Sequence, residues 1–159
     1  MAAALRPAFD YWLGGQGGDW APSISAFRLE DLPPALIPWC VIVDVRDDPL
    51  DYVYRFWGTK RTRLLGRDFT GRSVHELSPD AIRESVYAEY EEVRCSRQPM
   101  ISRHPAPLSS SQVVHFESIR LPITRDGDAV DRIFATICYQ DFTEDHYRLF
   151  GTDNYAMGF

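Results

Sequence analysis

The segment 55-RFWGTKRTRLLGRDFTG-71 decides how the fold of this chain is interpreted, because it joins an aromatic, strand-like run to a basic helical turn and ends at a glycine. Its glycines and its basic residues allow two interpretations: a phosphate or nucleic-acid site, or the turns of a small sensory fold. A P-loop needs its glycines between a strand and a helix and ends in Gly-Lys-Ser/Thr. Lys60 follows Gly58 without that frame, so the segment does not match a P-loop.

The charge of the chain argues against nucleic acid as the main partner. The net charge is −6 and Lys60 is the only lysine, whereas duplex binding draws most of its affinity from clustered Lys and Arg side chains that neutralise phosphates. The arginines around Lys60 are interrupted by Asp68 and Glu76. We therefore interpret the basic stretch as a solvated helix face.

Length, composition and cysteine spacing indicate one ordinary domain. The chain has 159 residues, of which 45% are hydrophobic and 25% charged, close to the average of globular proteins. Cys40, Cys95 and Cys138 are too widely spaced for a disulfide framework or a zinc motif. No run of about eighteen apolar residues predicts a membrane span, and residues 1–9 lack the pattern of a secretory signal. We expect a cytoplasmic protein with reduced thiols.

A hairpin and a long helix are the clearest elements before residue 100. The runs 40-CVIVDV-45 and 52-YVYRFW-57 are β-branched or aromatic and flank a turn, which predicts a β-hairpin. A helix is predicted over residues 80–97, where apolar side chains recur at the helical period. These side chains are Ile82, Val86, Tyr90 and Val93. Shorter helices are predicted over residues 8–14 and 59–66.

Three more strands are predicted after residue 100. Residues 113–140 contain two long strand-like runs joined by Asp126-Gly127, a favourable pair for a hairpin turn, and these strands should lie near the sheet centre. Residues 100–106 predict a short strand interrupted by Pro105. The order of elements predicts an α+β domain with an antiparallel sheet of about five strands and helices packed on one face.

Five short sequence motifs, together with their spacing, resemble those of the compact stand-alone PAS-domain proteins of alphaproteobacteria. The motifs are 11-YWL-13, 44-DV-45, 54-YRFWGT-59, 66-GRDFTGR-72 and 121-LPITRDGDAV-130. The resemblance runs from Phe9 to Asp141 and implies a PAS-like fold, with a five-stranded antiparallel sheet, helices on one face, an N-terminal docking helix and a cavity for a ligand or signal. We expect one domain over residues 1–159, made of an N-terminal helical extension (8–39), a PAS core (40–141) and a C-terminal tail (142–159).

Within this resemblance the glycines of the opening segment are structural. Gly58 ends the second strand at a sharp turn of the backbone, Gly66 suits a left-handed helix terminus, and Gly71 suits a turn. Trp57 stands where smaller aliphatic residues are common in the family, which implies a partly filled cavity.

Neither a cofactor nor a metal site is predicted, and the identity of any ligand stays open. A flavin photosensor of this fold resembles a pattern with a reactive cysteine in an Asn-Cys-Arg-Phe word, which this chain lacks. A haem sensor would need an axial histidine on the predicted helix 80–97, which contains none. The four histidines lack the close spacing of structural zinc sites. No nucleophile elbow or paired acid and base is visible, so we expect no enzyme activity.

Polar side chains in core-like strands predict a ligand site. Arg55, His115, Glu117 and Tyr139 must, if buried, be paired or offered to a ligand. An arginine in a half-apolar pocket suits a planar carboxylate, because its fork donates two parallel hydrogen bonds, so a small carboxylate or aromatic acid is the expected ligand. The predicted ligand-binding residues are Tyr54, Arg55, Trp57, Tyr87, Tyr90, His115, Glu117 and Tyr139. The alternative is that Arg55 and Glu117 pair with each other or with backbone groups in a buried network without a ligand.

The sequence thus predicts a sensory or regulatory PAS module that binds a small molecule non-covalently between its sheet and its long helix. An apolar helix outside the core must be covered, so we expect an interface with a second copy or a signalling protein there. The predicted interface residues are Phe9, Tyr11, Trp12 and Leu13. A ligand-free interaction adapter with a filled core and a small α+β enzyme are the alternative functions.

Overall fold

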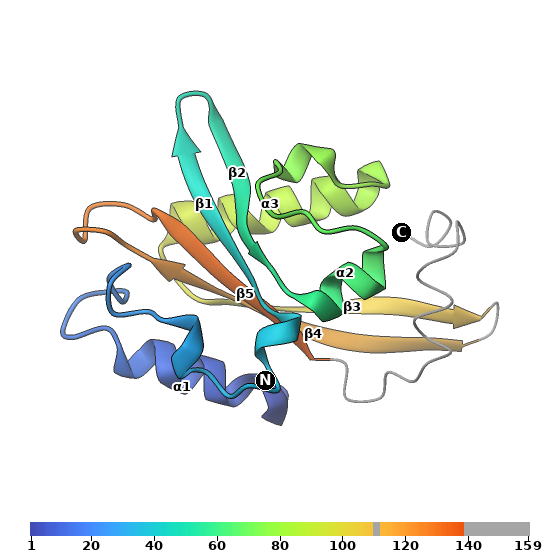
Figure 1. Ribbon diagram of the computed structural model, residues 1–159, viewed down its shortest axis with the longest axis horizontal. Helices are drawn as coiled ribbons and strands as arrows, with labels where there is room; N and C mark the ends of the chain where they lie inside the picture. The colour runs from blue at the N-terminus through green and yellow to red at the C-terminus, as the bar shows by residue number, and fades with distance from the viewer. Residues whose placement is uncertain (110–111, 139–159) are drawn as a thin grey trace.

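A computed structural model describes residues 1–109 and 112–138, and over this part of the chain five strands form one antiparallel sheet (Figure 1). The strands lie in the order β2-β1-β5-β4-β3. Their bounds are β1 Val41–Asp47, β2 Leu50–Trp57, β3 Met100–Ser109, β4 Gln112–Ile123 and β5 Arg132–Cys138. The predicted α+β class, the β1–β2 hairpin and the antiparallel sheet are confirmed. The predicted C-terminal tail, residues 142–159, lies outside the described residues.

The strand order follows from the side chains that each strand carries. As predicted, β4 and β5 pair with each other, and β5 lies at the centre of the sheet beside β1. β3 lies at the edge and pairs with β4 from Met100 to Ser109, beyond the residues 100–106 that the sequence predicted. Its prolines, Pro105 and Pro107, are tolerated because an edge strand has one side without ladder hydrogen bonds.

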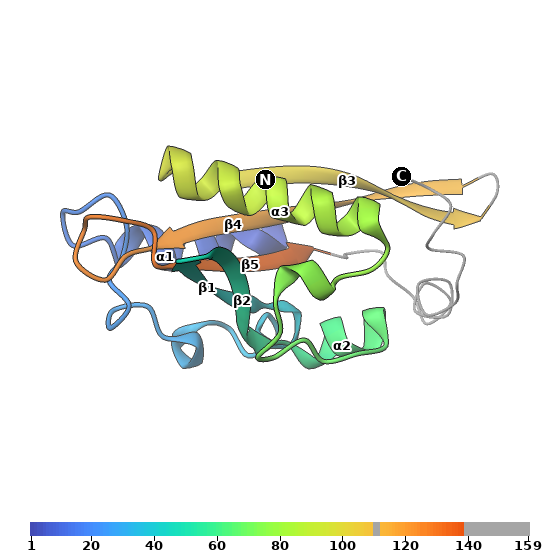
Figure 2. The same cartoon turned by 90° about the horizontal axis from the view of Figure 1, so that it is seen from above.

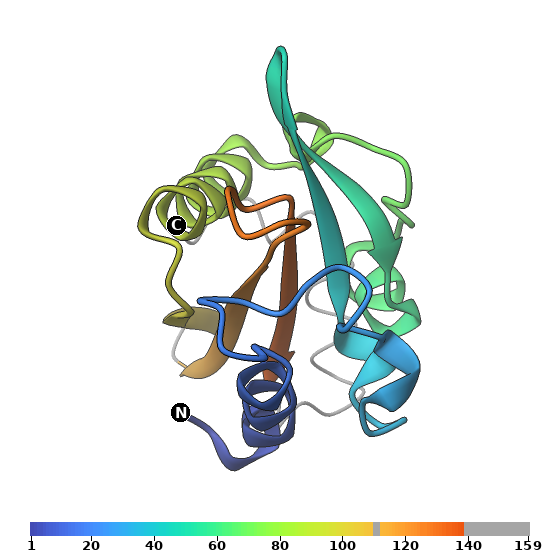
Figure 3. The ribbon, with the colours of Figure 1, turned by 90° about the vertical axis from the view of Figure 1, so that its left-hand side faces the viewer.

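Helices cover both faces of the sheet. α3 (Asp80–Ser96) lies along β3 and β4 (Figure 2), and α2 (Thr59–Leu65) lies on the same side, at the end of β2. α1 (Arg6–Gly14) packs on the opposite face, as Figure 3 shows. Short 3₁₀ helices are η1 Ala3–Leu5, η2 Leu29–Asp31, η3 Ile37–Trp39 and η4 Val74–Glu76. None of the helices in the described ranges is long and apolar enough to cross a membrane.

The alternation of side chains along the strands builds a separate apolar core on each face. On the α1 face, Trp12 packs with Ile119, Leu121 and Phe134, and its indole N–H donates to the Pro122 carbonyl at 2.6 Å. On the α3 face the core combines residues of β1, β2, β5 and α3. Its members include Val43, Tyr52, Tyr54, Trp57, Tyr90 and Val93. The two cores fix α1 and α3 against the sheet from opposite sides.

A β-bulge in β2 sets which side chains reach the α3 face. Ile42 pairs with Phe56 and Val43 with Tyr54, so Arg55 is an extra residue between two paired positions. The bulge changes the parity of the strand. Tyr54 and Trp57 consequently both lie in the α3-side core, although strict alternation would place them on opposite faces.

Gly58 joins β2 to α2 at a point of close backbone approach. A Cβ atom at this position would lie 2.2 Å from the Pro38 carbonyl oxygen, and the Gly58 N–H donates to the Cys40 carbonyl at 2.9 Å. Its φ of −67° is ordinary, so the requirement for glycine is steric rather than conformational. Gly66, by contrast, ends α2 with a left-handed φ of 71°.

We predict that Gly58→Ala lowers the free energy of unfolding by about 2 kcal/mol or more, because the added methyl group meets backbone atoms that cannot turn away. Gly14→Ala is the matched control, since a Cβ there meets no atom within 4 Å. Urea denaturation of the two variants and the parent measures the difference. Equal stability of Gly58→Ala and the parent would contradict the steric account.

Candidate functional site

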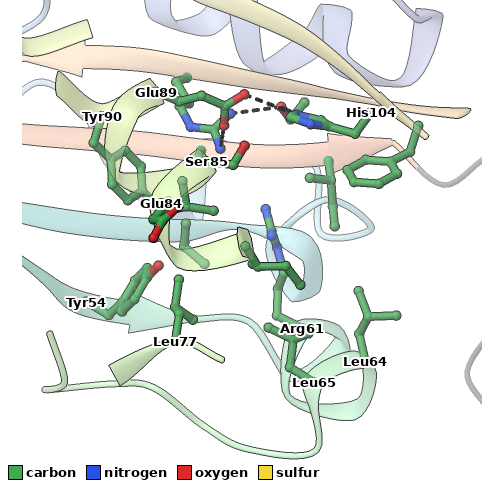
Figure 4. A pocket seen from close by; sticks show the side chains of 18 of the residues that line it. Tyr54, Arg61, Leu64, Leu65, Leu77, Glu84, Ser85, Glu89, Tyr90 and His104 are labelled. Atoms are coloured by element: carbon green, nitrogen blue, oxygen red, sulfur yellow. Dashed lines mark hydrogen bonds and ion pairs between the residues drawn. The ribbon is translucent and has the colours of Figure 1, made fainter. Parts of the chain in front are cut away.

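A cavity of about 450 Å³ lies between the α3 face of the sheet and helices α2 and α3 (Figure 4). Its apolar wall includes Val41, Leu64, Leu77, Ile82, Ala135 and Ile137. Its polar lining includes Tyr54, Trp57, Arg61, Glu89, Tyr90, His104, Ser118 and Arg120. The size and the mixture of an apolar wall with a few polar groups are those of small-molecule sites.

The floor of the cavity is one row of side chains that crosses four strands. Trp57 of β2 pairs with Val41 of β1, Val41 with Ala135 of β5, and Ala135 with Arg120 of β4. Paired residues of an antiparallel sheet point to the same face, and all four residues line the cavity. The space arises because the two inner positions carry small side chains while Trp57 and Arg120 stand at the two ends.

An ion pair between Glu89 of α3 and Arg120 of β4 closes one end of the cavity. The two residues are 8% and 6% exposed, and Arg120 Nη2 contacts Glu89 Oε2. Arg120 Nη1 also donates to Ser118 Oγ at 2.9 Å, and its guanidinium lies 5.4 Å from the centre of the Tyr90 ring. The pair therefore connects α3, the helix that forms the roof of the cavity, directly to the sheet.

His104 of β3 extends this network toward the edge of the sheet. Its Nε2 lies 3.3 Å from Glu89 Oε1 and 3.1 Å from Ser118 Oγ. Both contacts use the same ring nitrogen, whereas the histidine of a Ser-His-Asp triad uses its two different nitrogens. The arrangement therefore orders Glu89 rather than activating Ser118 as a nucleophile.

The network determines the ionisation of the buried acids. Burial alone raises the pKa of Glu89, but the His104 hydrogen bond and the charge of Arg120 outweigh burial and hold that pKa below its usual value. Burial raises the pKa of Tyr54 well above its usual value, and burial also raises the pKa of Tyr90. Glu89 is thus a carboxylate at neutral pH, and both tyrosines are neutral phenols.

Two residues that line the cavity each carry a buried N–H group without a hydrogen-bond partner among the described residues: Trp57 at Nε1 and Arg120 at Nε. Trp57 is 6% exposed, as is Arg120. Leaving a buried donor without an acceptor costs about 1–3 kcal/mol, so each such group calls for an explanation. Both belong to the cross-strand row that forms the cavity floor.

Arg61 of α2 contributes a second cation. Its side chain points from α2 into the cavity (Figure 4), and its Nε donates to the Trp39 carbonyl at 2.9 Å. Among the ion pairs of the described residues none includes Arg61. Its charge lowers the pKa of Tyr54 and Tyr90, although burial dominates both shifts, which shows that its field reaches the cavity.

Comparison with known proteins identifies the family. A family model described as "PAS domain" matches residues 1–138. The chain belongs to the PAS domain family. No curated protein matches the chain. Among solved structures, a fungal LOV domain photoreceptor is similar with a TM-score of 0.43 and 13% sequence identity, over 70% of this chain and 79% of that chain. The predicted PAS-like fold is confirmed, with a cavity between the sheet and the α3 helix.

The structure brings together three of the predicted ligand-binding residues of this PAS domain. Tyr54, Trp57 and Tyr90 line the cavity. Tyr87 is half-buried outside the cavity lining, where its ring packs against Tyr52 with centroids 5.3 Å apart. Tyr139 lies outside the described residues.

The other three predicted ligand-binding residues lie away from the cavity, and the prediction of a pocket lined by them is wrong. Arg55 is exposed at the bulge and pairs with Asp44. His115 is exposed, and Glu117 accepts the Ala2 backbone N–H at 2.5 Å on the α1 side. His115 and Glu117 alternate with Ser118 and Arg120 along β4, so they point to the opposite face of the sheet. Of the alternative pairings, Arg55 and Glu117 do not bind each other, whereas Glu117 does bind a backbone group, the Ala2 N–H.

Sequence reasoning missed Arg61, Glu89, His104 and Arg120. The sequence did contain an indication for Arg120, because it stands between the apolar residues Ile119 and Leu121 in a predicted strand. The sequence contained no comparable indication for Glu89, because a glutamate beside Tyr90 is an ordinary polar position on an amphipathic helix. Only the packing of α3 on β4 shows that these two charges face each other.

The predicted interface residues on α1 are mostly engaged with the protein itself. Trp12 is 2% exposed and belongs to the α1-side core, so it is not available as an interface residue. Phe9 and Tyr11 are half-buried against the same core. Leu13 is 50% exposed. The helix is covered by the sheet of its own chain, which the sequence alone did not show.

We predict that Glu89→Gln lowers stability at neutral pH by about 3 kcal/mol, because it leaves Arg120 buried without its counter-charge. The folded-state pKa of Glu89 is depressed, so its contribution is fully present above the unfolded-state pKa of about 4.3 and is lost as pH falls through the lower folded-state pKa. The difference between parent and variant should therefore shrink below about pH 4.3 in denaturation curves.

Glu76→Gln is the matched control, because an exposed ion pair with Arg72 also lowers the pKa of Glu76. Salt screens exposed pairs far more than buried ones. Raising NaCl to about 0.5 M should remove the effect of Glu76→Gln and leave most of the effect of Glu89→Gln. If both effects vanish with salt, the Glu89–Arg120 pair is not buried in solution.

Proposed function

We propose that this PAS domain is a cytoplasmic sensory or regulatory module that binds a small molecule non-covalently in the cavity between its sheet and α3. Occupancy is reported through a partner protein or a dimer face rather than by catalysis. The observation that carries the proposal is the pair of buried, unpartnered N–H donors, Trp57 Nε1 and Arg120 Nε, on two residues that line a cavity of about 450 Å³.

A bound molecule explains these donors better than a filled core does. An acceptor atom of a ligand would satisfy each donor and remove a cost of about 1–3 kcal/mol per group. The cavity also lies beside small residues, Val41 and Ala135, where larger side chains would close it. A core selected for stability alone would be packed without such a space.

A ligand-free adapter is the second candidate, and the Glu89–Arg120–Ser118–His104 network supports it. This network pairs its charges without any other molecule. It gives no partner to Trp57 Nε1, however, and it leaves the apolar volume over Val41 and Ala135 unexplained. The ligand-binding function accounts for both features.

The roof helix is the element through which occupancy would be transmitted. α3 contributes Ile82, Glu89 and Tyr90 to the cavity wall, so a ligand touches it directly. α3 also carries exposed residues such as Glu92 and Cys95. A shift of α3 against the sheet would change the surface offered to a partner. Leu13 of α1 is the exposed apolar residue that we assign to a dimer or partner contact.

The proposal predicts that Ala135→Leu abolishes ligand binding while the protein still folds, because the larger side chain fills the cavity floor. Protein purified without denaturation should carry a small non-covalent mass in native mass spectrometry, and adding the released compound should raise the melting temperature. Ala26→Leu, at an exposed position, is the matched control and should keep both properties. If Ala135→Leu still carried the bound mass, the ligand would lie outside this cavity and the proposed site would be wrong.

A further inference from the structure

We infer that the ligand is a small organic acid with a second, uncharged oxygen: its carboxylate binds between Arg120 Nε and Arg61, and the second oxygen accepts the Trp57 Nε1 proton. This inference rests on the proposed function and names the chemical class of the molecule that the same cavity takes. Three features of the cavity support it, namely its charge, the edge of Arg120 that is left free, and the separation of its two donors.

The charge of the cavity lining favours an anion. Arg61 and Arg120 bring two positive charges, and the buried Glu89 balances one of them. Glu84 also lines the cavity, but it is exposed on α3, where water screens its charge. A buried or half-buried cation without a partner is costly. A carboxylate in the cavity would therefore be the counter-charge that Arg61 lacks among the described residues.

The free edge of Arg120 limits how that carboxylate binds. The two Nη atoms already face Ser118 Oγ and Glu89 Oε2, which uses one N–H group of each and disfavours a fork of two parallel hydrogen bonds from both Nη atoms to the ligand. Nε is the nitrogen of this guanidinium that has no partner among the described residues, and Arg120 lines the cavity. Arg120 thus supplies one directed hydrogen bond, and Arg61 supplies the attraction of a nearby positive charge.

The second oxygen follows from the position of Trp57. Trp57 and Arg120 stand at opposite ends of the row Trp57–Val41–Ala135–Arg120, with two strands between them. Neighbouring strands are about 4.8 Å apart, so the two donors belong to separate subsites and not to one carboxylate. Between them lie Val41 and Ala135, which suit a flat apolar body. An aromatic ring with an oxygen substituent opposite its carboxylate has this form.

The test uses three probes of nearly equal size, and isothermal titration calorimetry measures their affinities. 4-Acetylbenzoate carries both recognised groups, 4-ethylbenzoate lacks the second oxygen, and methyl 4-acetylbenzoate lacks the charge. We expect 4-acetylbenzoate to bind about tenfold more tightly than either of the others, because each loss leaves one buried group of the protein without its partner.

Two variants assign each preference to its residue. Trp57→Phe should reduce the preference for 4-acetylbenzoate over 4-ethylbenzoate to about one while keeping the preference for acid over ester. Arg61→Gln should reduce the preference for acid over ester to about one and keep the preference for 4-acetylbenzoate over 4-ethylbenzoate. Comparable affinities for all three probes, tighter binding of the ester, or no binding by any probe would overturn the inference. If Trp57→Phe and Arg61→Gln each reduced both preferences, for acetyl over ethyl and for acid over ester, to the same extent, the arrangement of two separate subsites would also be overturned.

Native mass spectrometry of the natively purified protein tests the proposed ligand-binding function separately from the chemical class of the ligand. A bound neutral compound would overturn the acid and leave the ligand-binding function standing. The absence of any bound mass together with no response to the probes would overturn both. Ala135→Leu should bind none of the probes in either case, which shows that measured binding occurs in this cavity.

Discussion

The contact between Glu89 and Arg120 is the constraint on which the rest of the site depends. Each side chain would be strongly destabilising if it were buried alone, and each is tolerable because the other faces it across the gap between α3 and β4. The pair therefore fixes the position of α3 along the sheet. Everything that α3 contributes to the cavity, including Ile82 and Tyr90, follows from that position.

The same contact explains why a polar network and an apolar cavity lie side by side. On the β3 side His104 contacts Glu89 Oε1 and Ser118 accepts from Arg120 Nη1, whereas the β5 and β1 side is apolar. There the floor consists of Val41 and Ala135, which are too small to reach α2 and α3. A larger residue in either place would bring the packing of this face close to that of the α1 face, which is filled by Trp12, Phe27 and Phe134.

The architecture could be predicted from the sequence further than the site could. Periodicity and turn residues predicted the elements, because a strand such as 40–45 or a helix such as 80–97 is encoded locally. The bulge at Arg55 was not encoded in that pattern. The extra residue breaks the alternation between Arg55 and Trp57 and brings Trp57 onto the α3 face beside Tyr54. A single extra residue reversed the assignment of faces.

The missed residues depend on contacts between elements that are distant in the chain. Glu89 and Arg120 are each unremarkable on their own element, and only the packing of the long helix on the fourth strand turns them into a buried pair. His115 and Glu117 were wrongly predicted to line the cavity, because they share β4 with Arg120 but point to the other face of the sheet. In this chain the face of β4 that lines the cavity could be assigned only once the positions of α1 and α3 were known.

The most direct test of the account is a high-resolution crystal structure of the protein purified without denaturation. The account predicts density for a small molecule over Val41 and Ala135, with an acceptor atom within hydrogen-bond distance of Trp57 Nε1 and another at Arg120 Nε, and with Glu89 still paired to Arg120. A cavity closed by its own side chains, with both donors bound to protein atoms, would contradict it.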